Sequence, residues 1–173
     1  MPPDALTLDE INALGRDAFV ARLGFVFERS PWVAAAAWDA RPFRSRAALH
    51  AAMVAAMWAA PREQQLALIR AHPDLAGKAA IAKELTAEST REQASAGLDR
   101  LTPAEFARFT ELNDAYRARF AFPFIICVRE HTKASILANF VERIAHSPDD
   151  ERHTALGEIA KIAALRLNDA VRE

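Results

Sequence analysis

His72 is the histidine of this chain whose surroundings best suit chemistry, because it lies between a predicted amphipathic helix and Pro73. Proline restricts the backbone beside it, so the imidazole is expected at a rigid corner and not on a solvated helical face. An imidazole held in this way can act as a general acid or base near neutral pH. Position alone supports equally well an alternative interpretation, in which His72 only contacts the last carbonyl groups of the preceding helix.

A hydroxyl, a carboxylate and an amide occur together at helical spacing in Ser89, Glu92 and Gln93. Residues three and four positions apart share one face of a helix, so these groups can orient one small polar molecule. The spacing from Ser89 to Glu92 is also that of a capping box, which occurs at ordinary helix starts. A structural cap is the more common explanation of such a pair when it is taken alone.

Arg166 lies at the margin of the apolar stripe that Ile159 and Ile162 form on the last predicted helix. Most arginines in such a place bury their methylene groups and extend the guanidinium to water. A guanidinium that points inward would instead clamp an anion or a carbonyl oxygen of a ligand.

Two competing functions use the same residues differently. A metal-dependent hydrolase would draw its ligands from His72, Asp74, Glu92 and His131. No His-Glu-x-x-His motif or comparable ligand pair supports it, so the sequence predicts no metal site. In a non-enzymatic helical interaction module, the helix-end histidine and the capping box would be purely structural. The remaining histidines have weaker contexts and are interpreted as structural or exposed: His50, His131, His146 and His153.

Helices are expected to position all of these residues. Glycine is scarce, at 5 residues, and apolar side chains recur at steps of three and four. Phe19, Leu23 and Phe27 mark one face of an early helix. Later helices are predicted to begin at a capping residue or a proline, at Ser30-Pro31, Ser45, Pro61, Thr102-Pro103, Thr132 and Ser147-Pro148.

A short apolar run, Phe124 to Val128, interrupts the helical pattern after Phe122-Pro123. Its length fits either a strand or a buried extended connector. Because no partner strand is evident, we predict a connector near residues 122–128. The expected fold class is therefore all-α: a single-domain multi-helix bundle that spans residues 1–173 and contains this connector.

Composition and charge disfavour several classes of function. A chain of 173 residues with 51% hydrophobic and 26% charged residues is expected to form one globular domain. Its net charge of -1 disfavours binding to nucleic acid or to an anionic membrane, and no stretch is apolar enough to span a bilayer. Cys127 is the sole cysteine, which excludes an internal disulfide. With no targeting segment evident, we expect a cytoplasmic protein.

Three ordered motifs resemble those of the OHCU decarboxylase family, the 2-oxo-4-hydroxy-4-carboxy-5-ureidoimidazoline decarboxylases of uric-acid degradation. The first is AHPDLAGK at residues 71–78, and the second is STREQ at 89–93 followed by AGLD at 96–99. The third runs from LNDAY at 112–116 to FPFIICVR at 122–129. The resemblance extends over nearly the whole chain.

This resemblance implies an all-α enzyme, usually a homodimer, that needs no cofactor and no metal. The implied reaction converts a small-molecule substrate, 2-oxo-4-hydroxy-4-carboxy-5-ureidoimidazoline (OHCU), to (S)-allantoin and carbon dioxide. This substrate carries its own electron sink, because its carboxylate is attached one carbon away from a ring C=N bond. Neither pyridoxal phosphate nor a metal is then required to accept the electrons.

The resemblance also assigns roles to residues of this sequence. His72 and Glu92 fall on the catalytic positions. The substrate-contacting positions are those of Pro73, Ser89, Gln93, Phe124, Ile125, Ile126 and Arg166. Among these, the stretch from Phe124 to Ile126 would line the site with main-chain groups. Ala121 departs from the pattern, because the family commonly has glycine there and alanine disfavours a positive φ angle.

Overall fold

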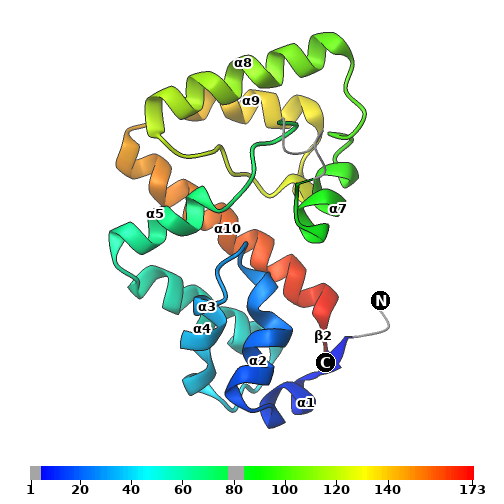
Figure 1. Ribbon diagram of the computed structural model, residues 1–173, viewed down its shortest axis with the longest axis vertical. Coiled ribbons are helices and arrows are strands. Elements are labelled where there is room, and N and C mark those ends of the chain that lie inside the picture. The colour runs from blue at the N-terminus through cyan, green and yellow to red at the C-terminus, as the bar shows by residue number, and fades with distance from the viewer. Residues whose placement is uncertain (1–4, 78–83) are drawn as a thin grey trace. The chain divides into compact units, whose positions relative to one another are not determined.

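The computed structural model describes residues 5–77 and 84–173, which form a predominantly helical protein (Figure 1). The all-α prediction is therefore confirmed. Lys78 of the first motif and the N-terminal residues 1–4 lie outside the described residues. The chain divides into two compact units: one contains the residues up to Ala71 together with Ile159–Glu173, and the other contains His72–Glu158.

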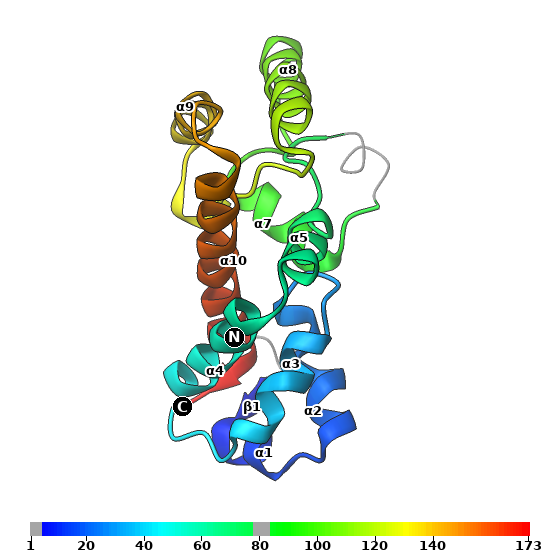
Figure 2. The same ribbon diagram turned by 90° about the vertical axis from the view of Figure 1, so that its left-hand side faces the viewer.

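The first unit consists of short helices and one small sheet. Its elements are β1 Leu6–Thr7, α1 Leu8–Ala13, α2 Arg16–Leu23, η1 Gly24–Val26, α3 Trp32–Ala37, η2 Trp38–Ala40, α4 Arg46–Ala59, α5 Arg62–Arg70, the last turns of α10 Pro148–Ala170, and β2 Val171–Arg172. Helix α3 packs against α2 and against α4 (Figure 2). No sequence pattern predicts the parallel pairing of β1 with β2, because two-residue strands are too short to show alternation.

Helices α4 and α5 begin where the sequence predicts, and α5 also ends where it predicts. The Ser45 hydroxyl caps α4 by accepting a hydrogen bond from the Ala48 N–H at 3.0 Å. Helix α5 begins directly after Pro61 and ends at Arg70, ahead of the His72 corner. The cap predicted at Ser30 is wrong, because its hydroxyl donates to the Glu28 carbonyl oxygen instead.

The second unit contains α7 Ala87–Ser95, α8 Pro103–Phe120, η3 Val128–Glu130, α9 Lys133–Arg143 and the first turns of α10. Helix α8 begins with the predicted capping box: the Thr102 hydroxyl accepts from the Glu105 N–H, and the Glu105 carboxylate accepts from the Thr102 N–H. The bond from the Thr102 N–H is the main cause that lowers the pKa of Glu105. Thr132 caps α9 in the predicted way. Helices α8 and α9 lie side by side in both views (Figures 1 and 2).

An aromatic cluster forms the core of the second unit and anchors the segment between α8 and η3. The Phe124 ring stacks on Phe140 of α9 with the ring centroids 3.7 Å apart. Tyr116 of α8 meets Phe124 edge-on, with the centroids 5.3 Å apart. Such aromatic pairs stabilise a core beyond the area that they bury. The segment is therefore held between two helices.

The predicted connector is confirmed, because residues 123–127 are buried without helix or strand. It follows Ala121, which adopts the left-handed conformation with φ 58° and ψ 25°. Alanine thus takes the backbone geometry that glycine would adopt without strain, and its side chain is exposed. None of the helices in the described ranges is both long and apolar enough to cross a membrane.

Candidate active site

His72 lies in a tight corner whose backbone is shaped by its own sequence. It is 7% exposed and follows the end of α5, where Ala71 closes the helix. Ala76 adopts a left-handed φ of 51°. A Cβ atom on Gly77 would lie 2.8 Å from the Cβ atom of Asp74, closer than side chains tolerate, so glycine is required there. The imidazole is therefore carried by a compact turn, as the sequence predicts.

Gln93 of α7 holds this corner through two hydrogen bonds to its backbone. The Ala76 N–H donates to Oε1 of Gln93 at 3.0 Å, and Nε2 of Gln93 donates to the Asp74 carbonyl oxygen at 3.3 Å. The side chain is buried. These bonds bring the polar face of α7 against the segment that carries His72.

Helix α8 holds the same corner from Asn113 and Arg117. Nδ2 of Asn113 donates to the Leu75 carbonyl oxygen at 2.8 Å. Nε of Arg117 donates to the Asp74 carboxylate, 3.0 Å from Oδ1 and 3.2 Å from Oδ2. Because this ion pair is partly exposed, its contribution to stability is small and its effect is mainly on geometry.

The capping-box interpretation of Ser89 and Glu92 is wrong, because α7 begins earlier than that interpretation requires. Thr86 is the N-cap, and its hydroxyl accepts a hydrogen bond from the Ser89 N–H at 3.3 Å. Ser89 and Glu92 are therefore both inside the helix, on the face shared with Gln93. Ser89 and Gln93 are buried and Glu92 is partly exposed. A hydroxyl, a carboxylate and an amide are thus grouped on one turn without a capping role.

Helix α7 also contacts η3, the turn that directly follows the connector. Three of the predicted site segments belong to the second unit: the His72-Pro73 corner, the Ser89 to Gln93 face, and the stretch from Phe124 to Ile126, which continues into the η3 turn that α7 contacts.

Arg166 belongs to the first unit, and its guanidinium is buried there, with 3% of the residue exposed. Nη1 donates to the Phe25 carbonyl oxygen at 2.9 Å, and Nη2 donates to the Glu28 carboxylate at 2.8 Å. The interpretation that Arg166 extends its guanidinium to water is therefore wrong. The inward orientation is the one that a clamp requires.

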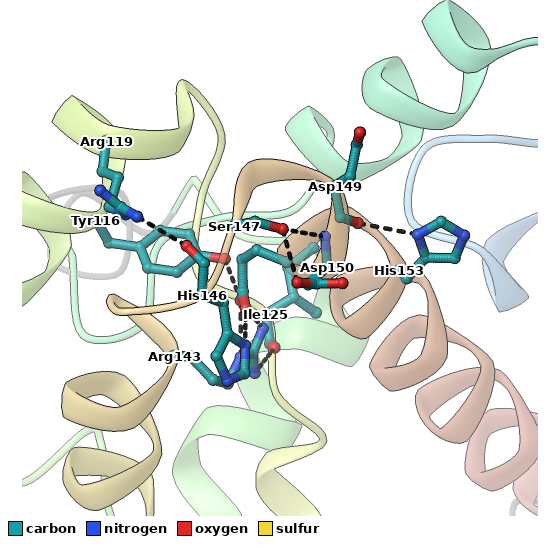
Figure 3. Close-up of polar contacts among 10 residues, drawn as sticks. Tyr116, Arg119, Ile125, Arg143, His146, Ser147, Asp149, Asp150 and His153 are labelled. Carbon is teal, nitrogen blue, oxygen red and sulfur yellow. Dashed lines mark hydrogen bonds and ion pairs between the residues drawn. The ribbon is translucent and has the colours of Figure 1, made fainter.

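Sequence reasoning missed a polar cluster in the second unit, in which the buried residues Tyr116, Arg143 and Glu151 meet the partly exposed His146. Figure 3 labels Tyr116, Arg143 and His146. Burial raises the pKa of Tyr116, and the Glu151 carboxylate that its hydroxyl contacts raises this pKa further. One signal was present in the sequence. Arg143 continues the apolar stripe of α9 at helical spacing from Ile136 and Phe140, which points it into the core.

Two of the residues considered as metal ligands, Asp74 and His131, contact other side chains. In the described parts of the chain, no group of three or more histidine, cysteine, aspartate and glutamate side chains is placed to hold a metal ion. The Asp74 carboxylate binds Arg117, and Nδ1 of His131 lies 3.0 Å from the Ser135 hydroxyl.

Comparison with known proteins assigns the family. The sequence model of the OHCU decarboxylase family matches residues 12–168. The chain belongs to the OHCU decarboxylase family. A decarboxylase of this name from Halalkalicoccus jeotgali is 45% identical over 95% of this chain and 91% of its own length. The corresponding Bos taurus protein is 40% identical over 97% of this chain and 99% of its own length.

A solved structure supports the same family. The crystal structure of (S)-allantoin synthase has a TM-score of 0.77 and 32% sequence identity to this OHCU decarboxylase family member. The similarity covers 96% of this chain and 54% of that chain. As an OHCU decarboxylase, the protein is an enzyme of the carboxy-lyase class. Membership of this family replaces the two alternative interpretations, the interaction module and the metal-dependent hydrolase.

Proposed function

We propose that this enzyme decarboxylates OHCU to (S)-allantoin and carbon dioxide as a step of uric-acid degradation. The names of its relatives support this substrate. The observation that carries the proposal is the pair of hydrogen bonds between the Gln93 side chain and the backbone, accepted from the Ala76 N–H and donated to the Asp74 carbonyl oxygen. These bonds join the polar face of α7 to the segment that carries His72, which supports a site where α7 side chains orient the substrate and His72 transfers protons.

The chemistry needs no electron acceptor besides the substrate. The bond between C4 and the carboxylate breaks, and its electron pair forms a C4=C5 double bond as the C5=N1 pair moves onto N1, which takes up a proton. The resulting enol then loses the hydroxyl proton at C4 and gains a proton at C5. The sum is one proton taken up, one carbon dioxide released and allantoin formed. The face on which C5 is protonated decides the product's chirality.

His72 and Glu92 are proposed to perform these proton transfers, at a pocket shaped by Pro73. His72 would contact the hydroxyl and the departing carboxylate, where a neighbouring acid/base group lowers the barrier. Glu92 would hold the ring or ureido N–H groups and tune His72. The breaking C4–carboxylate bond overlaps best with the C=N π system when it stands out of the ring plane, so orientation lowers the barrier in addition to proton transfer.

The orienting contacts are proposed for Ser89, Gln93 and Arg166, which would bind the substrate carbonyl groups, and for main-chain groups of Phe124, Ile125 and Ile126. The resemblance to the family supports each of these roles. The burial of Ser89 and Gln93 on one turn of α7 further supports the orienting roles of these two residues, because buried polar groups are hydrogen-bonded and hold a fixed geometry.

We further propose that the chain acts as a single domain over 1–173, as a cytoplasmic homodimer that binds neither nucleic acid nor a membrane. The family match over residues 12–168 supports one functional domain. The net charge of -1 supports the absence of a polyanionic partner. The single buried cysteine, Cys127, suits a reducing compartment.

The decisive experiment mixes the purified protein with OHCU freshly generated from urate and follows optical activity. OHCU is expected to decay unaided to racemic allantoin, so only chirality distinguishes catalysis from decay. We expect an excess of (S)-allantoin that forms faster than the racemate does in a sample without protein. A racemic product formed at the uncatalysed rate would refute the proposed function.

A further inference from the structure

The peptide group between Ile125 and Ile126 is held by a buried guanidinium. Arg143 of α9 is 4% exposed, and its Nη1 donates to the Ile125 carbonyl oxygen at 2.6 Å (Figure 3). Its carbon Cζ lies 4.3 Å from the centroid of the Phe124 ring. One side chain thus contacts both the backbone and an aromatic ring of the connector.

Glu151 of α10 fixes the orientation of this guanidinium. Glu151 is 0% exposed, and its Oε1 accepts a hydrogen bond from Nε of Arg143 at 2.7 Å. The same carboxylate accepts from the Tyr116 hydroxyl, and its Oε2 lies 3.0 Å from Nδ1 of His146. Figure 3 shows Tyr116, Ile125, Arg143 and His146 meeting at this point. The planar fork is therefore restrained on both sides, which a lysine ammonium could not reproduce.

Burial of an ion pair is a poor way to stabilise a fold. Desolvation of the two charges can exceed their attraction, and apolar residues of similar volume are often as stable in such a place. The Arg143–Glu151 pair is nonetheless buried. Its geometric effect on the connector is the more informative property.

Fixing the Ile125 carbonyl also fixes the Ile126 N–H. A trans peptide is planar, so its C=O and N–H point in opposite directions. Because the Ile125 C=O points at Arg143, the Ile126 N–H points away from it. The next amide is held separately, since the Cys127 N–H donates to Glu158 at 2.8 Å. Within the described ranges, the hydrogen bonds of this stretch include no protein acceptor for the Ile126 N–H, although Ile126 is buried.

We propose that Arg143, oriented by Glu151, is a positioning residue for the decarboxylation: it turns the Ile125–Ile126 peptide so that the Ile126 N–H binds the substrate. This inference rests on the proposed function, because that function makes the connector part of the substrate site. A buried N–H almost always has a hydrogen-bond partner. The substrate, rich in carbonyl and carboxylate oxygens, supplies an acceptor of the required kind.

The first test is Arg143→Lys, with Asn12→Ala as its matched control. Asn12 also holds an irregular backbone segment, through bonds to both the N–H and the C=O of Phe43, but in the first unit. We expect Arg143→Lys to lower kcat at least tenfold per folded molecule, with a smaller change in KM. The control should have a lower melting temperature than the wild type and keep kcat and KM within twofold of the wild-type values. Constants that stay within twofold for Arg143→Lys as well would overturn the proposal.

The second test uses the wild-type chain, so it does not depend on the folding of a variant. Amide resonances of ¹⁵N-labelled protein are followed during titration with (S)-allantoin. The Ile126 resonance should shift with ligand concentration more than that of Cys127, whose N–H is already bound. A stationary Ile126 resonance in a sample that binds (S)-allantoin would overturn the proposal. A racemic product from the wild-type protein would instead refute the proposed function itself. Failure of the Arg143 proposal and failure of the proposed function are therefore distinguishable.

Discussion

The Ala76 N–H donates to Oε1 of Gln93 at 3.0 Å, so a residue of α7 closes the turn that carries His72. The side chain proposed to contact the substrate therefore also supports the corner. Gln93→Leu keeps the volume but leaves the buried Ala76 N–H without its acceptor, which should cost about 1–3 kcal/mol of unfolding free energy. Urea unfolding measures this loss, and kinetics on the folded fraction should show a lower kcat. An unchanged unfolding midpoint would contradict the supporting role.

His72→Asn tests the acid/base assignment. A positioned general acid or base typically contributes 10² to 10⁴, so turnover should fall by roughly 10²-fold or more with the fold retained. His50→Asn is the control, because Nε2 of His50 lies 2.8 Å from the Ala160 carbonyl oxygen in the first unit. The control should affect melting temperature and not turnover. A well-folded, active His72→Asn variant would remove His72 from the mechanism.

Glu92→Gln tests the charge of a side chain that has no capping role, because Thr86 is the N-cap of α7. Glutamine keeps the shape and suits a helix equally well, so stability should change by no more than about 0.5 kcal/mol. Turnover should fall about as much as in His72→Asn. Glu88→Gln, one turn earlier and in a surface pair with Arg91, is the control and should retain activity. Equal rates for both variants would leave Glu92 without a catalytic role.

Arg166→Lys separates an ion-pair role from a substrate clamp. Lysine keeps the charge but lacks the planar fork whose two nitrogens donate to the Phe25 carbonyl and to Glu28, so the melting temperature should fall. If Arg166 also contacts substrate, KM or kcat should deteriorate beyond the loss of folded protein. Glu28→Gln weakens the ion pair and keeps the guanidinium, so it should be destabilised with kinetics closer to wild type. Identical kinetics in the two variants would argue against the clamp.

Ala121→Gly should stabilise the enzyme by about 1 kcal/mol, because a left-handed conformation costs an L-residue roughly 1–2 kcal/mol and glycine loses part of this gain through its freer unfolded chain. The matched control is Ala115→Gly, at an exposed position inside the same helix α8, which should be destabilised by about 1 kcal/mol. Chemical denaturation of both variants gives the two signs. Destabilisation of both would mean that Ala121 makes contacts that outweigh its backbone strain.

The sequence by itself determined where several helices begin. Capping at Ser45, Thr102 and Thr132 depends on hydrogen bonds that reach only three residues along the chain, so neighbouring residues are sufficient to predict it. The corner at His72-Pro73 is equally local, because proline stops the preceding helix. The ordered motifs then indicated the family, and the match over residues 12–168 showed it.

The tertiary structure decided which polar groups are buried and what they hold. Arg166 is paired with Glu28, 138 positions away in the sequence, and Arg143 reaches Ile125, 18 positions away. A buried guanidinium needs hydrogen-bond acceptors that compensate for its lost hydration, and here distant elements of the chain supply them. The local sequence around an arginine does not show where those acceptors lie. For the same reason helical spacing placed Ser89, Glu92 and Gln93 on one face, while only the packed structure revealed that Gln93 holds the corner of His72.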